Sequence, residues 1–380
     1  MHTMAEPSKT RLYKTERVLN RTLRVAYPPG RGRMVLRTEQ DWERNLEPLA
    51  VNEDGSVSTF ALEADQPFLY FKPCLVESGA THWSLGPNKL AIMTEPDARV
   101  AYPYFFSPEA GRFSSLVELP SKILGRDHKI RGYLPPGYDE NTLSRLPVVY
   151  MQDGQNLFFP EDAFLGQDWK VSETGSVLRA MNAVEDSIIL GIYSGDRMTE
   201  YTKPGYELYA RSLVEEVVPE VERVGIRTAQ HRRYRSVWGS SLGGVVSFYT
   251  VWQHPDVFGC AVCMSSTFSH RDDLIDRVFA EPFRDVGFYL DSGWPGDNYE
   301  VTVGMAMALI SRGWEYGRNL LHLCFPMAEH SETSWGMRLH LPMQFLNGAV
   351  ARAYRVKKPV LGDHPFPEQS VPASSVPRTS

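Results

Sequence analysis

Short, continuously apolar segments alternate with helical patterns through the second half of the chain, and this alternation restricts the fold more than any other feature. Strands are predicted at residues 129–134, 146–151, 187–193, 237–238, 260–264, 287–290 and 320–325. Helical patterns lie between or after them, at residues 174–181, 209–224, 243–253, 301–312 and 335–353. Because strands that are apolar on both faces must be covered on both, the pattern predicts an α/β fold with a mainly parallel sheet and helices on both faces.

Residues 23–103 show a different pattern, in which short apolar runs are separated by turn signals. Strand candidates lie at residues 33–37, 57–62 and 68–72, with few helical patterns between them. This spacing predicts a small all-β sandwich. Trp42 and Trp83 are interpreted as core aromatics of that sandwich; platforms that stack on sugar rings are the alternative.

The length of 380 residues favours two domains. We expect a loose lead-in at residues 1–20, a β-sandwich domain of immunoglobulin-like or carbohydrate-binding-like type at 21–105, and the α/β domain at 106–356. Residues 102–120 are interpreted as a connecting segment. Residues 357–380 are rich in proline and serine and are predicted to form a disordered tail.

Composition excludes several classes of partner. The chain is 42% hydrophobic and 23% charged with a formal net charge of −6, and it has no basic stripe for a nucleic acid. No run approaches the length of a membrane span, and the first 17 residues lack the apolar core of a secretory signal. Cys260 and Cys263 form C-x-x-C inside an apolar run, which favours two buried strand residues over a redox pair or half a zinc site. A cytoplasmic location is therefore expected.

The motif G-x-S-x-G occurs at residues 239–243, directly between a predicted strand and a predicted helix. That context is typical of a nucleophile elbow, in which small residues let the helix pack close to the strand. Ser241 would project its hydroxyl from the corner, near the positive end of the helix. Ser241 is therefore the candidate nucleophile.

A serine nucleophile needs a base and an acid, which should follow strands in the order Ser, acid, His. Asp297 lies in a Gly/Pro loop after the strand at 287–290 and is the favoured acid; Asp291 and Glu300 are the alternatives. His330 lies on the loop after the strand at 320–325 and is the favoured base. Of the other histidines considered, His322 lies inside a strand, His254 lies at a helix end and His340 lies within the last helical pattern.

An oxyanion would need two backbone N–H groups, one from the residue after the nucleophile and one from the loop after an earlier strand. The first is that of Leu242. For the second, Gly154 permits a bend that would turn the amide of Gln155 inward.

Ordered motifs between residues 129 and 353 resemble the putative-esterase family, the esterase D type of α/β-hydrolase, which includes enterochelin and feruloyl esterases. The motifs are V-V-Y-M-Q-D-G-Q-N-L-F at 148–158, R-M-T-E-Y-T at 197–202, L-V-E-E-V-V-P at 213–219, W-G-S-S-L-G-G at 238–244, H-P-D-V-F-G at 254–259 and E-H-S-E-T-S-W at 329–335, with Trp169 between the first two. Some enterochelin-esterase-like members carry a β-sandwich ahead of the catalytic domain, which is similar to the pattern before residue 105.

The resemblance implies a serine hydrolase that cleaves a carboxylic ester through an acyl-enzyme, with no metal or other cofactor. Acyl transfer to an alcohol and an inactive, ligand-binding hydrolase domain are the alternatives. Arg197, Glu200 and Tyr201 could line the substrate cleft or make structural contacts, and Trp169 with Trp294 could form an aromatic wall. The expected partner is a small-molecule ester; a homo-oligomeric state is left open.

Overall fold

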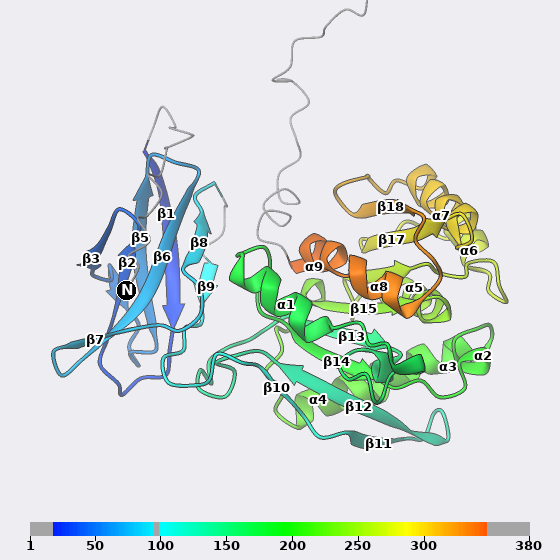
Figure 1. Cartoon of the computed structure of the whole chain (residues 1–380), viewed down its shortest axis with the longest axis horizontal. Helices are drawn as coiled ribbons and strands as arrows, with labels where there is room; N and C mark the ends of the chain where they lie inside the picture. Colours follow the sequence, from blue (N-terminus) through cyan, green and yellow to red (C-terminus); the bar gives the residue numbers. More distant parts are fainter. Residues whose placement is uncertain (1–17, 95–98, 348–380) are drawn as a thin grey trace, which may run out of the picture.

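The computed structural model describes residues 18–94 and 99–347, which form two all-β sheets followed by a large α/β part (Figure 1). Most of the predicted lead-in, the predicted tail at 357–380 and the end of the predicted helix at 335–353 lie outside the described residues. Within the described ranges, no helix combines the length and the apolar character that a membrane crossing requires.

The N-terminal part consists of two sheets that share one core. The first has the order β4-β5-β1-β9, and the second has the order β3-β2-β6-β7 with β8 also paired to β6. Leu23 and Phe60 from the first sheet and Leu36 and Phe71 from the second are fully or almost fully buried in the same cluster. The strands are β1 Leu19–Ala26, β2 Arg33–Thr38, β3 Asp41–Leu46, β4 Ala50–Val51, β5 Val57–Ala64, β6 Phe68–Glu77, β7 Ala80–Trp83, β8 Lys89–Ile92 and β9 Arg99–Ala101.

Trp42 and Trp83 do not belong to this core, so that prediction is wrong. Trp83 ends the edge strand β7 and is 39% exposed, and its ring centre lies 6.1 Å from that of the partly exposed Trp42. The guanidinium of Arg37 lies 5.0 Å from the ring centre of Trp83. Smaller rings, those of Phe60 and Phe71, fill the space between the sheets instead.

The α/β part is built on a nine-stranded sheet of order β10-β12-β14-β13-β15-β16-β17-β18, with β11 also paired to β12. Strands β13 to β18 are parallel to their neighbours, whereas β12 is antiparallel to β14. A mainly parallel sheet was predicted, and the structure has one. The strands are β10 Arg112–Phe113, β11 Val117–Ser121, β12 Arg126–Leu134, β13 Val148–Gln152, β14 Ile188–Ile192, β15 Arg235–Ser240, β16 Cys260–Met264, β17 Gly287–Trp294 and β18 Leu320–Pro326.

Two expectations about this sheet are corrected. The segment 102–120 is not merely a connection, because β10 and most of β11 lie within it and pair with β12. The strand predicted at 287–290 continues to Trp294 as β17, because its register with β18 extends to the pair Trp294–Pro326. Asp291 therefore lies inside a strand rather than on the loop after it.

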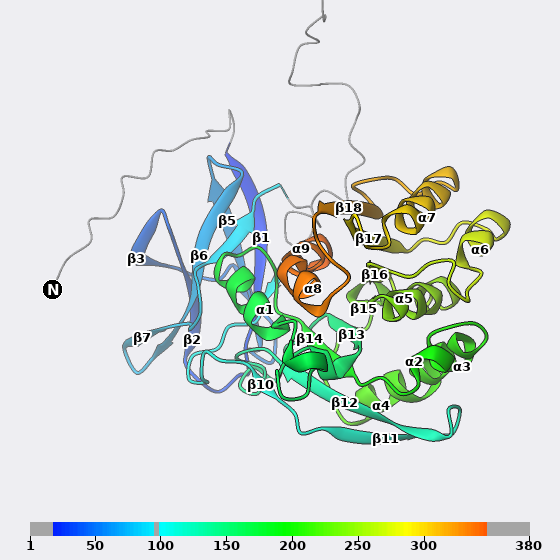
Figure 2. The same cartoon turned by 45° about the vertical axis from the view of Figure 1, so that its right-hand side comes forward.

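Helices cover both faces of the sheet, as the view in Figure 2 makes clear. The first face packs against α1 Val171–Ala180, α8 Glu332–Arg338 and α9 His340–Asn347. The second face packs against α3 Gly205–Ser212, α4 Val218–Arg223, α5 Leu242–Gln253, α6 Leu274–Ala280 and α7 Tyr299–Ser311. The helix predicted at 209–224 is a continuous run of α3, a π-helical turn at Leu213–Val217 and α4.

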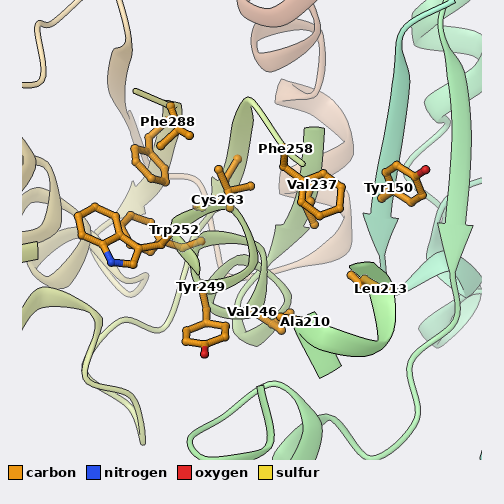
Figure 3. Close-up of a cluster of buried hydrophobic side chains, with 14 of the residues drawn as sticks. Tyr150, Ala210, Leu213, Val237, Val246, Tyr249, Trp252, Phe258, Cys263 and Phe288 are labelled. Atoms are coloured by element: carbon orange, nitrogen blue, oxygen red, sulfur yellow. The ribbon is translucent and has the colours of Figure 1, made fainter. Parts of the chain in front are cut away.

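Helix α5 contributes Val246, Tyr249 and Trp252 to the large hydrophobic cluster on the second face (Figure 3). All of its residues from Leu242 to Trp252 are buried, which is expected of a helix that is apolar around its whole circumference. The ring of Phe248 stacks on that of Phe288 from β17 at a centre-to-centre distance of 4.4 Å. The residue that precedes α5, Ser241, is thereby attached to one of the most deeply packed elements of the fold.

Glu140 holds the junction between the two parts. Its carboxylate accepts hydrogen bonds from the backbone N–H groups of Phe105, Phe106 and Ser107 at 2.7–2.9 Å. It also accepts one from the hydroxyl of Tyr27 at 2.9 Å, which comes from the end of the first sheet. These bonds fix the chain where the predicted division at residues 105 and 106 falls.

A buried histidine lies between the sheet and α3. The Nε2 atom of His128 is 3.0 Å from Oγ of Ser212, which in turn donates to the carbonyl of Tyr209. Since that hydroxyl proton is used, Nε2 must carry its own proton and donate it, which leaves Nδ1 as an acceptor with no hydrogen-bond partner among the described residues. Burial, helped by the nearby charge of Arg126, lowers the pKa of His128 to about 4.

Acidification is therefore expected to destabilise the fold through His128. In the unfolded chain the imidazole of His128 is protonated near pH 6.5, whereas in the folded chain it is protonated only near pH 4. The contribution of neutral His128 to the free energy of unfolding is therefore complete above pH 6.5 and declines as the pH falls. The loss by pH 5 should be about 2 kcal/mol. Urea unfolding at pH 7 and pH 5 measures it. The variant His128→Gln, whose amide can still donate to Ser212, should lose correspondingly less; an equal pH dependence in both proteins would contradict the assignment.

Candidate active site

Ser241 occupies the corner between β15 and α5 in a backbone conformation that few residues other than glycine adopt. Its φ is 55° and its ψ is −124°, a costly combination that the packing around it must maintain. A Cβ atom on Gly239 would lie 2.4 Å from the backbone of Gly243, and one on Gly244 would lie 1.9 Å from Oγ of Ser266. The strand–helix corner therefore leaves no room for a side chain at Gly239, the first glycine of the G-x-S-x-G motif, or at Gly244, the residue directly after that motif.

The structure brings Ser241, His330 and Asp297 into one hydrogen-bonded chain. His330 lies on the loop between β18 and α8, and its Nε2 is 2.9 Å from Oγ of Ser241. Its Nδ1 is 2.7 Å from Oδ1 of Asp297, which lies between β17 and α7. All three residues follow the carboxyl ends of parallel strands, where functional groups of such sheets gather.

Asp297 is buried, yet its surroundings favour the anion. Besides His330, it accepts hydrogen bonds from Oγ of Ser265 at 2.5 Å and from the backbone N–H groups of Gly293 at 2.7 Å and Asn298 at 2.8 Å. Burial alone would raise the pKa of Asp297, but these donors outweigh it and hold the pKa well below its ordinary value. The anion accepts the Nδ1 proton of the imidazole, so Nε2 is left to accept the proton of Ser241.

The two alternative acids are placed elsewhere. Asp291 is fully buried in β17, where it lies 3.0 Å from Nη2 of Arg338 and accepts a hydrogen bond from the hydroxyl of Tyr289 at 2.9 Å. Burial raises its pKa. Glu300 belongs to the first turn of α7. Among the described residues, Asp297 is the one carboxylate recorded in a hydrogen bond with the ring of His330.

The amides proposed for the oxyanion lie at two helix starts. Leu242 is the first residue of α5, and Gln155 lies in the single turn Gly154–Asn156 that follows β13. Such first-turn N–H groups have no acceptor within their own helix. A Cβ atom on Gly243 would come within 2.9 Å of Oδ2 of Asp153, so the turn after β13 lies beside the start of α5.

Trp169 and Trp294 do not form the predicted aromatic wall. Trp169 is fully buried, donates a hydrogen bond from its indole nitrogen to Glu332, and packs at 5.9 Å against Trp335. Trp335 in turn meets the ring of His330 edge to face at 5.0 Å. Trp169 thus packs in the core against Trp335, the residue that contacts His330, whereas Trp294 is 49% exposed at the end of β17.

The segment 197–201 makes mainly structural contacts. Arg197 forms an ion pair with the buried Asp153 at 2.9 Å, and burial raises the pKa of that aspartate despite the guanidinium. Glu200 forms an ion pair with Arg126, and Tyr201 is fully buried. Of these residues, Arg197 retains a partly exposed side chain at this edge of the sheet.

Four residues around the chain of hydrogen bonds were not singled out from the sequence. Ser265 contacts Asp297 and Trp335 contacts His330, while Arg338 donates to Ser265 and Glu332 accepts from Trp169. Ser265 follows β16 and Arg338 ends α8, so their meeting depends on how α8 lies against the sheet. Glu332 and Trp335 fall within the motif at 329–335, and that motif was the available signal for them.

Fold and site together define an α/β-hydrolase-like fold with a serine at the corner between β15 and α5. Residues 121–306 match the family model described as "Putative esterase". The recognition of this family from the sequence motifs is confirmed, and these residues are assigned to it.

Two proteins of Bacillus subtilis (strain 168) are also similar to the chain. The uncharacterized protein YbbA is 25% identical over 147 residues, and the uncharacterized protein YjcH is 29% identical over 150 residues. The matches cover 37% and 38% of this chain and 57% and 58% of the relatives. The chain thus spans somewhat more than half the length of the curated relatives it matches.

Solved structures share the fold at low identity. A ferulic acid esterase is 19% identical with a TM-score of 0.53, and the match covers 63% of this chain and 98% of that one. An enterobactin esterase from Shigella flexneri, crystallised in the presence of enterobactin, is 15% identical with a TM-score of 0.53, over 88% of this chain and 94% of that one. The second match covers so much of the chain that it must include N-terminal sheets as well as the α/β part.

Proposed function

We propose that the chain is a serine esterase that hydrolyses a carboxylic ester through a covalent acyl-enzyme. The observation that carries the proposal is the hydrogen-bonded chain from Ser241 through His330 to the buried anion of Asp297. A serine hydroxyl becomes a useful nucleophile when a neutral imidazole can take its proton and a carboxylate holds the imidazole tautomer.

In the first half of the reaction, Nε2 of His330 takes the proton of Ser241 as Oγ forms a bond to the ester carbonyl carbon. The carbonyl oxygen becomes an oxyanion, which the amides of Gln155 and Leu242 stabilise. When the bond to the leaving oxygen breaks, the imidazolium gives that oxygen its proton and the alcohol departs. Ser241 then carries the acyl group.

In the second half, water takes the place of the alcohol. His330 accepts a proton from water as its oxygen attacks the acyl carbonyl, and the same amides stabilise the second oxyanion. Collapse breaks the bond to Oγ, and the imidazolium returns the proton to Ser241. The acid is released and the site is restored.

A panel of esters tests the proposal. p-Nitrophenyl, feruloyl, thioester and siderophore esters should separate active from inactive acyl groups, and a fluorophosphonate probe should label Ser241. Added alcohol or sugar acceptors would reveal acyl transfer in the products. A protein that neither hydrolyses any ester in the panel nor reacts with the probe would overturn the proposal.

A further inference from the structure

Behind Asp297, on the side away from His330, lies a second set of polar groups that the mechanism above does not use. Nη2 of Arg338 donates to Oγ of Ser265 at 2.6 Å, and Ser265 donates to Oδ2 of Asp297 at 2.5 Å. Arg338 is 3% exposed and lies 3.0 Å from the fully buried Asp291. Its Nη2 is also 3.9 Å from Oδ2 of Asp297.

The direction of these hydrogen bonds follows from the chemistry of the groups. A guanidinium has five donors and no acceptor, so Ser265 must accept from Arg338. The single hydroxyl proton of Ser265 is then free to point at Asp297. The backbone keeps Ser265 in place, because its N–H donates to the carbonyl of Asp291 at 2.7 Å and its carbonyl accepts from Nδ2 of Asn298 at 2.8 Å.

The cluster of Asp291, Arg338, Asp297 and His330 changes its net charge during the proposed proton transfer. Asp291 and Arg338 neutralise each other, which leaves the charge of Asp297 for the imidazole. When His330 takes the proton of Ser241, Asp291, Arg338, Asp297 and His330 together become neutral, and the negative charge passes to the oxyanion at the amides of Gln155 and Leu242.

We infer that Ser265 and Arg338 are positioning residues that hold Asp297 as an anion aimed at His330, with Asp291 as the counter-ion of Arg338. The inference rests on the proposed esterase function and extends it to residues that do not touch the substrate. Four other titratable groups face the cluster: Tyr289, Cys263, Cys324 and Glu332. Burial raises the pKa of all four, so the tyrosine and the two cysteines stay neutral near pH 7.

The first test is Ser265→Ala. Losing one donor makes the Asp297 carboxylate more basic, so His330 is protonated at a higher pH, and the acid limb of the kcat/KM profile should move upward by about one pH unit. kcat at neutral pH should fall about tenfold with KM nearly unchanged, because the bond acts on the base and not on the substrate. Ser292→Ala is the matched control, since that buried β17 hydroxyl has no hydrogen-bond partner among the described residues; it should leave the profile as in wild type.

The second test separates positioning from folding. Arg338→Met alone would leave Asp291 buried without its cation and could unfold the protein. The double variant Arg338→Met/Asp291→Asn removes both charges of the pair and should fold. If Arg338 has a merely structural role, the double variant should regain the wild-type kcat and the wild-type acid limb of the kcat/KM profile, and that result would overturn the inference. We expect instead that the acid limb of the double variant stays at a higher pH than in wild type.

A measurement that needs no turnover keeps the two proposals distinguishable. The imidazole of His330 can be titrated by NMR in a Ser241→Ala background, with its signal assigned by its disappearance in His330→Asn. Adding Ser265→Ala or the double variant should raise the titration midpoint in the same direction as the acid limb. An unchanged midpoint would overturn the positioning role, whereas failure of the ester panel and of probe labelling would overturn the esterase function itself.

Discussion

Replacing Ser241 with alanine is expected to lower kcat for any ester that the wild-type protein hydrolyses by at least ~10⁴-fold. The variant keeps the oxyanion amides but has no atom that can form the acyl-enzyme. The fold should persist, because alanine fits the same corner and the one hydrogen bond recorded for the lost hydroxyl is that to His330. Initial rates and thermal unfolding of the two proteins measure both expectations.

Ser247→Ala is the matched control for that experiment. It removes a buried hydroxyl from α5, the helix that follows Ser241; this hydroxyl donates to the carbonyl of Gly243 at 2.7 Å and has no place in the chain of hydrogen bonds. Its rate should stay within a few-fold of wild type. Ester hydrolysis that survives unchanged in Ser241→Ala, but is sensitive to Ser247→Ala, would mean that the nucleophile has been assigned wrongly.

Asp297→Asn should lower kcat by ~10³- to 10⁴-fold, the second largest effect we expect. The neutral amide can no longer stabilise the imidazolium, and it can turn its own N–H₂ toward Nδ1 and so favour the wrong tautomer. Losing the anion also lowers the proton affinity of His330, so the acid limb of the residual activity should move to lower pH. This shift is opposite in sign to the one expected for Ser265→Ala.

The same substitution at the alternative acids tests the assignment. Glu300→Gln should be close to wild type, because Glu300 lies in the first turn of α7 with no recorded contact to the imidazole. Asp291→Asn should appear mainly as a loss of stability, since it leaves Arg338 buried without its counter-ion. A loss of kcat by ~10³-fold in Asp291→Asn, with Asp297→Asn active, would reverse the assignment.

Local sequence pattern was sufficient to predict most of the α/β part. The alternation of apolar strands and helices predicted the mainly parallel sheet, and the G-x-S-x-G motif predicted the strand-to-helix corner at Ser241. The order of strands along the chain placed Asp297 and His330 on loops at the same edge. These inferences succeed because burial of both sheet faces and the crowding of glycines are properties of short segments.

Pattern failed where a side chain's position depends on a partner far away in the sequence. Gly293 and Pro295 suggested a loop from residue 291 onward, but pairing with β18 extends β17 through Trp294 and draws Asp291 into the interior. Trp169 was predicted to form an aromatic wall with Trp294, yet Glu332 and Trp335 hold it in the core. Trp42 and Trp83 looked like core aromatics and lie outside it.

By itself, the sequence determined which residue is the candidate nucleophile, which histidine follows it in the right place and what kind of sheet carries them, because each depends on neighbours within a few residues. Only the tertiary structure decided which aspartate faces His330 and which groups stand behind it. That choice depends on the register of β17 against β18 and on how α8 packs against the sheet. The packing of α8 brings Arg338 next to Ser265, which lies 73 residues earlier in the chain. Such long-range contacts produce no periodic pattern in the sequence around the residues that make them.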